Sequence, residues 1–208
     1  MERPAAYDLI VIGGGINGTG IARDAAGRGL TVALVEQGDL ASATSSVSSK
    51  LVHGGLRYLE RYHFRQVREC LREREVLLRA APHLVSPLRF VLPLSDRQRP
   101  AALIRAGLFL YDHLGGESTL PKSEWVDLRT SPFGQPLRPE TTRAAVYSDC
   151  QGNDCRLVVA NAVDAVRLGC DVMTRTRVVR IVRRDDPAEG FDVHVVEGAR
   201  GGTTVLRA

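Results

Sequence analysis

Three glycines spaced G-x-G-x-x-G constrain the fold of this chain more than any other feature: Gly13, Gly15 and Gly18. They directly follow a continuous apolar run at 8–12, which is typical of a strand buried on both faces. An Ala-rich segment at 16–28, closed by Gly29, predicts a helix, and 31–36 predicts a second buried strand. The order predicts a β-α-β unit of about 30 residues.

Each glycine has a separate physical role in such a loop. Gly13 permits a tight turn, Gly15 lets the backbone approach a pyrophosphate, and Gly18 lets the helix pack closely. The N-terminus of the helix offers free N–H groups to phosphates. Glu36 ends the second strand, where a carboxylate accepts hydrogen bonds from ribose hydroxyls. These features favour an adenine dinucleotide over the alternative of a purely structural glycine turn.

A stretch rich in Ser and Thr at 43–50 favours FAD over NAD. A plain nicotinamide domain would proceed directly to its next helix, whereas hydroxyls and amides at this density suit a longer cofactor. Lys50, His53 and Arg57 add positive charge, which stabilises a reduced, anionic flavin. The alternative is a flexible polar loop.

The rest of the chain predicts alternating helices and strands. We expect helices over 56–81, 101–114 and 154–169, and strands over 89–94, 145–150, 171–175, 178–183, 191–196 and 203–206. The last three strands indicate a small antiparallel meander, and 115–144 has no clear period. The Arg-rich helix over 56–81 predicts a solvated face, with Glu75 and Arg79 one turn apart.

Composition makes several functional classes improbable. The 208 residues carry a net charge of +4, but all basic residues except Lys50 and Lys122 are Arg, interleaved with acids. With aromatic residues at 5%, this charge pattern argues against nucleic-acid binding.

The four cysteines form no C-x-x-C pair, and no metal site is expected. The start of the chain lacks a signal-peptide pattern and no apolar run could span a membrane, so a cytoplasmic location is favoured.

Two segments resemble the FAD-dependent glycerol-3-phosphate dehydrogenases of the aerobic, respiratory type. Segment 12–29 reads IGGGINGTGIARDAAGRG, and segment 44–60 reads TSSVSSKLVHGGLRYLE. Shorter matches lie at 111–114, 147–150 and 154–157. The resemblance implies a flavoprotein that oxidises sn-glycerol 3-phosphate to dihydroxyacetone phosphate. Hydride would pass to FAD, electrons would pass to a respiratory quinone, and the complete protein would lie peripherally on the inner face of the cytoplasmic membrane.

The resemblance also implies roles for individual residues. Those expected to hold FAD are Gly13, Gly15, Asn17, Gly18, Glu36, Thr44, Ser45, Ser49, Lys50, His53, Gly54 and Gly55. Arg57 and Tyr58 would face the substrate. A planar guanidinium can bind a phosphate with two parallel hydrogen bonds. The alternatives are a surface ion pair of Arg57 with Glu60 and plain core packing of Tyr58.

The predicted fold is α/β: a Rossmann-type FAD-binding domain split in sequence, with the start of a substrate domain inserted. The expected segments are 1–85 and 150–208 for the FAD-binding domain and 86–149 for the substrate domain. Family members are much longer, so we expect an N-terminal fragment, and we name no catalytic base within it. His53 could serve as a base, but its place beside Gly54 favours a flavin contact.

Three alternative functions remain open at this point. The first is a glycerol-3-phosphate oxidase that uses oxygen. The second is another flavoenzyme of the same fold that oxidises amines or hydroxy acids. The third is a non-catalytic module that binds a dinucleotide, or an inactive truncated FAD-binding fragment.

Overall fold

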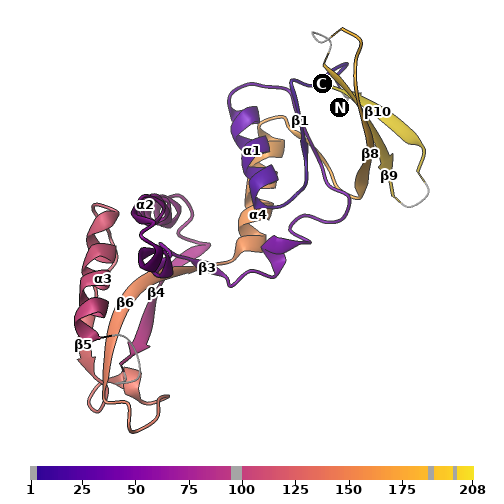
Figure 1. The fold of residues 1–208 in the computed structure, drawn as a ribbon. Coiled ribbons are helices and arrows are strands. Elements are labelled where there is room, and N and C mark those ends of the chain that lie inside the picture. Colours follow the sequence, from indigo (N-terminus) through magenta and orange to yellow (C-terminus); the bar gives the residue numbers. More distant parts are fainter. Residues whose placement is uncertain (1–3, 95–99, 187–189, 199–200) are drawn as a thin grey trace. The chain divides into compact units, whose positions relative to one another are not determined.

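The computed structural model describes residues 4–94, 100–186, 190–198 and 201–208. The chain forms two compact units (Figure 1). The first unit joins 1–49 to 153–208, and the second is the continuous segment 50–152. The FAD-domain boundaries after residues 85 and 149 stay predictions, because a compact unit is not by itself a functional assignment.

A parallel sheet of three strands lies at the centre of the first unit. Its order is β1 (Leu9–Ile12), β2 (Val32–Val35) and β7 (Asp171–Met173). Leu9 pairs with Val32, and Ala33 pairs with Asp171. The helix α1 (Ile16–Gly27) connects β1 to β2, which confirms the predicted β-α-β unit.

Helices α1 and α4 (Asp154–Arg167) pack on one face of this sheet. Small side chains make the close packing possible: Ala22 and Ala165 are fully buried together with Leu34. Asn153 caps α4, because its side chain accepts a hydrogen bond from the Arg156 N–H at 3.0 Å.

An antiparallel sheet packs against the opposite face. Its strands are β8 (Thr176–Arg183), β9 (Phe191–Glu197) and β10 (Thr203–Arg207), in the order β10-β9-β8, so the predicted meander is confirmed. Val193 and Val195 pack against Ala33 and Val35 of β2. Alternate side chains of β2 therefore enter two different cores, which explains its unbroken apolar sequence.

In the second unit, helices pack against an antiparallel sheet. The long strand β6 (Arg143–Gly152) pairs antiparallel with β3 (Leu51–Val52), β4 (Val85–Pro93) and β5 (Glu124–Asp127). Helices α2 (Phe64–Ala80) and α3 (Ala101–Leu114) bring Val67, Leu71 and Tyr111 into one core with Tyr147 of β6. The second unit also contains the 3-10 helices η2 (Leu56–Arg61) and η3 (Pro132–Gly134), and the first unit contains η1 (Thr44–Ser46).

The structure of the second unit differs from several expectations. The predicted helix over 56–81 is interrupted at Tyr62, whose φ of 58° ends η2 in the left-handed region. The predicted solvated face contains two buried charges, Arg74 and Glu75. Arg79 Nε donates to the backbone oxygen of Glu75 at 3.3 Å, so the expected side-chain pair does not form. Segment 115–144 also contains a strand, β5.

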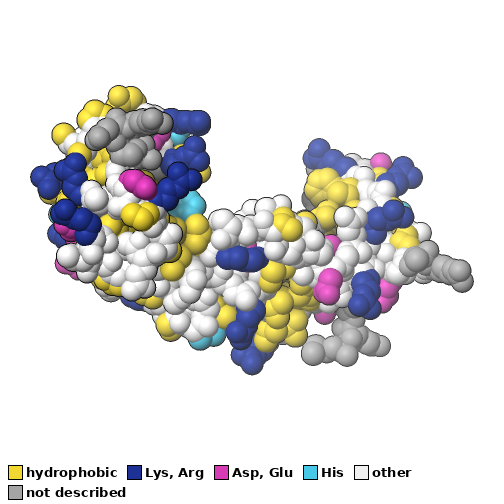
Figure 2. Space-filling view, turned by 90° about the horizontal axis from the view of Figure 1, so that it is seen from below, with side chains coloured by type: hydrophobic (Ala, Val, Ile, Leu, Met, Phe, Trp, Pro, Cys, Tyr) yellow, Lys and Arg dark blue, Asp and Glu magenta, His cyan; other side chains and the backbone are white. Residues whose placement is uncertain are grey.

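Charge is dispersed on the face drawn in Figure 2. Lys and Arg side chains stand there in separate groups among apolar and uncharged side chains. No helix within the described residues is long and apolar enough to cross a membrane.

Candidate functional site

The glycine loop between β1 and α1 forms the floor of the largest cavity we describe. Gly13 has a φ of 112°, which favours glycine, and its N–H donates to the Val35 oxygen at 2.8 Å. A Cβ at Gly18 would lie 1.9 Å from the Gly13 oxygen. The loop can therefore close onto the first turn of α1 only if residue 18 has no side chain.

The N-terminus of α1 opens towards this cavity. Gly15 is the N-cap residue and supplies no side-chain cap, and the first turn has no acidic residue. The Ile16 N–H donates instead to Ser45 Oγ at 3.2 Å. The partial positive charge of this helix end is thus available to an anion.

Glu36 is held by backbone amides on both sides. Its Oε2 accepts from the Gly14 N–H and its Oε1 from the Gly38 N–H, each at 2.7 Å. A Cβ at Gly14 would lie 2.9 Å from Glu36 Cβ, so only glycine allows this approach. A carboxylate has about four acceptor positions, so Glu36 keeps capacity for ribose hydroxyls.

The cavity has a volume of about 1110 Å³ and lies at the carboxyl ends of the parallel strands. Open α/β sheets bind ligands at this edge, and most ligand pockets measure roughly 300–1000 Å³. It gathers seven of the residues predicted from sequence: Gly13, Gly15, Asn17, Gly18, Glu36, Thr44 and Ser45. A glycine-lined floor, a helix N-terminus and a carboxylate together fit the pyrophosphate and ribose of FAD.

Two arginines on the cavity wall were missed by the sequence analysis. Arg175 and Arg177 line the cavity together with Val196 and Gly198. Arg175 has a φ of 52°, and its N–H donates to the Gly38 oxygen at 2.8 Å. The position of Arg175 in the sequence could have indicated this place on the cavity wall, because Arg175 follows the carboxyl end of β7, which pairs with β2.

The Ser/Thr segment packs against α4 within the first unit. Ser45 is buried, and its backbone oxygen accepts from the Cys155 thiol at 3.3 Å. The Ser48 hydroxyl donates to the Asp154 carboxylate. Ser49 is exposed and is not among the described residues that line the cavity.

The other predicted site residues belong to the second unit: Lys50, His53, Gly54, Gly55, Arg57 and Tyr58. His53 and Arg57 are exposed, and Tyr58 is 37% exposed. Gly54 and Gly55 are buried. Gly55 has a φ of 73°, and a Cβ there would lie 2.3 Å from the ring of Tyr58.

A network of buried polar side chains contacts the turn formed by residues 53–55. Arg74 Nη1 donates to Asp149 Oδ1 at 2.8 Å, and the Tyr111 hydroxyl is 2.8 Å from both oxygens of Asp149. Burial opposes the charge on Arg74, but the hydrogen bond and charge of Asp149 outweigh it and raise the pKa of Arg74. Burial and the negative Asp149 raise the pKa of Tyr111 far above its ordinary value, so its hydroxyl stays protonated.

The comparisons with known proteins agree with a flavin site. The family model described as "FAD dependent oxidoreductase" matches residues 8–207. A D-erythritol 1-phosphate dehydrogenase of Brucella abortus is 55% identical over 208 residues, which is 100% of this chain and 41% of that protein. A glycerol-3-phosphate dehydrogenase of Pseudomonas aeruginosa is 62% identical over 173 residues, which is 83% of this chain and 33% of that protein.

A solved structure gives the same result. The glycerol-3-phosphate dehydrogenase of Bacillus halodurans complexed with FAD aligns with a TM-score of 0.70 and 27% identity, covering 99% of this chain and 33% of that one. The chain thus spans between 33% and 41% of the length of these proteins. The family model and the Bacillus halodurans structure both name FAD as the cofactor. Since the family model matches almost the whole chain, this protein belongs to the FAD-dependent oxidoreductases.

Proposed function

We propose that this chain forms the FAD-binding part of an enzyme that oxidises sn-glycerol 3-phosphate to dihydroxyacetone phosphate. The identity of 62% with a glycerol-3-phosphate dehydrogenase over 173 residues carries the choice of substrate. The cavity at the carboxyl ends of β1, β2 and β7 supports the redox class, because its polar groups suit a dinucleotide.

The first unit is proposed to hold the ADP half of FAD. The N-terminus of α1 would receive the pyrophosphate next to Gly15, and Glu36 would accept from the ribose hydroxyls. Thr44 and Ser45 line the same cavity and would extend the contact along the cofactor. When bound, FAD supplies a hydride acceptor for the carbon that bears the substrate hydroxyl.

The second unit is proposed to contact the flavin and the substrate. Lys50 and the turn at 53–55 would continue the cofactor path from Ser49. Arg57 and Tyr58 lie on η2 directly after this turn and are exposed. Arg57 would bind the phosphate of the substrate through its planar guanidinium.

D-erythritol 1-phosphate is the second candidate substrate. The relative of that name matches all 208 residues, whereas the glycerol-3-phosphate dehydrogenase match covers 173. Both molecules are polyol phosphates, so the same phosphate contact at Arg57 would serve either one.

A respiratory quinone is the proposed electron acceptor, with oxygen as the alternative. A quinone reductase must meet the membrane, so we propose a peripheral location on the inner face of the cytoplasmic membrane. The proposed FAD domain comprises 1–85 and 150–208, and 86–149 would begin the substrate domain.

Anaerobic flavin reduction tests these proposals directly. The FAD-loaded protein is mixed separately with sn-glycerol 3-phosphate, D-erythritol 1-phosphate and glycine, and flavin absorbance is followed. We expect one of the two phosphates to bleach the flavin rapidly. Bleaching by glycine alone would contradict the proposal and favour an amine-oxidising flavoenzyme. An oxygen electrode and a quinone-analogue assay then distinguish the two acceptors.

A further inference from the structure

A buried network of hydrogen bonds in the second unit ends on the backbone amide of Gly54. The Gly54 N–H donates to the Tyr111 hydroxyl at 2.8 Å and lies 3.3 Å from Asp149 Oδ1. Tyr111 and Asp149 are 2% and 3% exposed. This amide is therefore held by a phenol and a carboxylate that come from α3 and β6.

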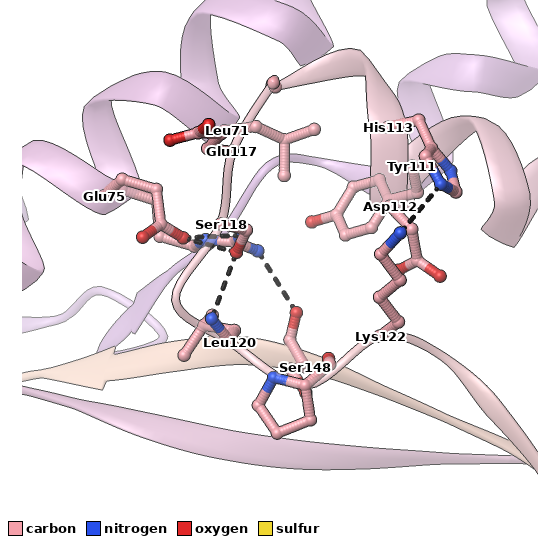
Figure 3. A pocket seen from close by; sticks show the side chains of 14 residues that line it. Leu71, Glu75, Tyr111, Asp112, His113, Glu117, Ser118, Leu120, Lys122 and Ser148 are labelled. Carbon is pink, nitrogen blue, oxygen red and sulfur yellow. Dashed lines mark hydrogen bonds and ion pairs between the residues drawn. The ribbon is translucent and has the colours of Figure 1, made fainter.

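The same network extends through α2 to the wall of a second cavity (Figure 3). Arg74 joins Asp149 to Ser118, because its Nη2 donates to Ser118 Oγ at 3.2 Å. Glu75 Oε1 accepts from Ser118 Oγ at 2.7 Å, and its Oε2 accepts from Thr119 Oγ1 at 2.8 Å. These hydrogen bonds lower the pKa of Glu75 despite the opposing effect of burial. Arg74 forms ion pairs with both Glu75 and Asp149, at 3.1 and 2.8 Å.

Steric fit adds a second constraint on Gly54. A Cβ at this residue would lie 2.3 Å from Leu71 Cδ2 and 2.7 Å from the Tyr111 hydroxyl. Leu71 packs in one core with Val67 and Tyr111. The backbone at Gly54 is thus pressed against α2 and α3, with its N–H used internally.

We propose that Tyr111 and Asp149 are positioning residues that fix the turn at 53–55 for the flavin. The inference rests on the proposed function, in which this turn contacts FAD. The Gly54 N–H is already used by Tyr111 and cannot also donate to a cofactor. The Gly55 N–H, by contrast, donates to no described residue although Gly55 is buried. Because the Gly54 N–H is occupied, the Gly55 N–H is the donor that this turn offers to an acceptor atom of the flavin.

Arg74 is the counter-charge that makes this arrangement possible. A buried carboxylate needs compensation, and Arg74 Nη1 supplies it to Asp149 at 2.8 Å. Arg74 also donates to the Ser148 oxygen at 3.1 Å, which ties the guanidinium to the backbone of β6. The carboxylate can then accept from the Tyr111 hydroxyl, whose position sets the position of the Gly54 amide.

Residue-resolved hydrogen exchange tests the assignment without any substitution. The amide of Gly54 should exchange slowly both with and without FAD, since its acceptor belongs to the protein. The Gly55 amide should exchange at least about tenfold more slowly after FAD is added. If the Gly55 rate did not change, or if Gly54 alone responded to FAD, the assignment would be overturned.

The variant Tyr111→Phe removes only the hydroxyl that holds Gly54. In the FAD-loaded protein we expect the dissociation constant of FAD to rise about tenfold, as for one lost hydrogen bond, and the visible flavin spectrum to shift. Asp149→Asn keeps an acceptor oxygen but removes the charge, and should show a change in the same direction. If Tyr111 and Asp149 had only a structural role, the variants would have a lower thermal midpoint. The flavin spectrum and the FAD affinity of the folded protein would then be unchanged.

Tyr147→Phe is the matched control. The Tyr147 ring packs edge-on against Tyr111 with centroids 6.0 Å apart, but its hydroxyl forms no hydrogen bond to any described residue. FAD affinity should change less than about twofold in this variant. Equal losses in both tyrosine variants would overturn the positioning role. If the unaltered protein binds FAD but neither polyol phosphate reduces it, the substrate proposal fails while the Tyr111 comparison remains valid.

Discussion

Gly18 illustrates how one missing Cβ can decide a binding loop. The Gly13 oxygen lies where a side chain at residue 18 would begin, at 1.9 Å from the ideal Cβ position. That atom belongs to the backbone of the loop, so it cannot move without opening the turn at Gly13. The cavity depends on this contact because the same loop forms its floor.

Gly18→Ala should therefore displace the loop and reduce FAD retention at least about tenfold, which corresponds to ~1.4 kcal/mol. Gly20→Ala is the control in the same helix, since a Cβ there meets nothing within 4 Å. Alanine is the better helix former, so Gly20→Ala should be neutral or stabilising by about 1 kcal/mol. The measurement is bound flavin per chain after gel filtration. Equal retention in both variants would show that the loop tolerates the side chain.

Arg57→Ala tests the phosphate contact. Losing a hydrogen bond to a charged group costs about 1.5–3 kcal/mol, so KM for the polyol phosphate should rise about 10- to 100-fold with FAD content unchanged. Arg61→Ala, also exposed on η2, should change KM less than about threefold. Steady-state kinetics with a dye acceptor measures both variants. A parallel loss in the two would indicate a general electrostatic effect instead of a specific contact.

The four free cysteines should differ sharply in reactivity. Burial raises the pKa of Cys150 and of Cys170 to about 11. At pH 8 such a thiol is only about 0.1% thiolate, compared with roughly a quarter for an ordinary cysteine. Iodoacetamide should therefore label the partly exposed Cys70 and Cys155 first. Mass spectrometry of the native protein checks the order, and early labelling of Cys150 or Cys170 would contradict it.

At the scale of elements, the first unit depends on how closely α1 can approach the sheet and α4. Ala22 is fully buried among Val11, Leu34 and Ala165. Arg23 Nε donates to Asp164 across the two helices at 2.7 Å, but the side chains are 50% and 42% exposed. An exposed pair of this kind contributes about 0–1 kcal/mol, so apolar packing holds the helices.

Ala22→Leu should consequently lower the free energy of unfolding by about 1–3 kcal/mol, because extra methyl groups find no space in a packed core. Ile21 is the adjacent residue and is 54% exposed. Ile21→Ala should change stability by no more than about 0.5 kcal/mol. Urea titration followed by circular dichroism compares the two variants. A smaller loss in Ala22→Leu than in Ile21→Ala would contradict the packing argument.

At the scale of the whole molecule, the chain leaves the first unit after Ser49 and returns to it at Asn153. Each unit has its own apolar core. The single tryptophan, Trp125, lies on β5 of the second unit, whereas the dinucleotide cavity lies in the first. The fluorescence of Trp125 therefore reports on the second unit, and the release of bound flavin reports on the first.

Excess FAD should stabilise the first unit more than the second, because the described residues that line the cavity proposed for the ADP half of FAD all belong to the first unit. A ligand at about 100 times its dissociation constant adds about 2.7 kcal/mol to the unit that binds it. We expect flavin release to move to a higher urea concentration than the change in Trp125 fluorescence. Apoprotein, followed by circular dichroism and fluorescence, is the reference. Coincident transitions with and without FAD would show that the chain unfolds as one cooperative unit.

Much of the first unit and part of the site could be predicted from sequence. The glycine loop, α1 and β2 lie within residues 13–35, so their spacing and apolar period report local geometry directly. The seven predicted residues that line one cavity also lie close together in sequence, all between residues 13 and 45. Strand β5 was missed because Glu124–Asp127 reads Glu-Trp-Val-Asp, which forms neither a continuous apolar run like that of β2 nor a period-2 alternation.

Only the tertiary structure decided which charges would be buried. Arg74 and Glu75 stand in a segment rich in Arg and Glu, and sequence spacing favoured solvent for both. Their partners, Asp149 and Ser118, lie 75 and 43 positions away along the chain. A charge can leave water only where such partners surround it, and no local pattern records that condition. The sequence alone therefore determined the local loop geometry, while long-range contacts determined the network that holds Gly54.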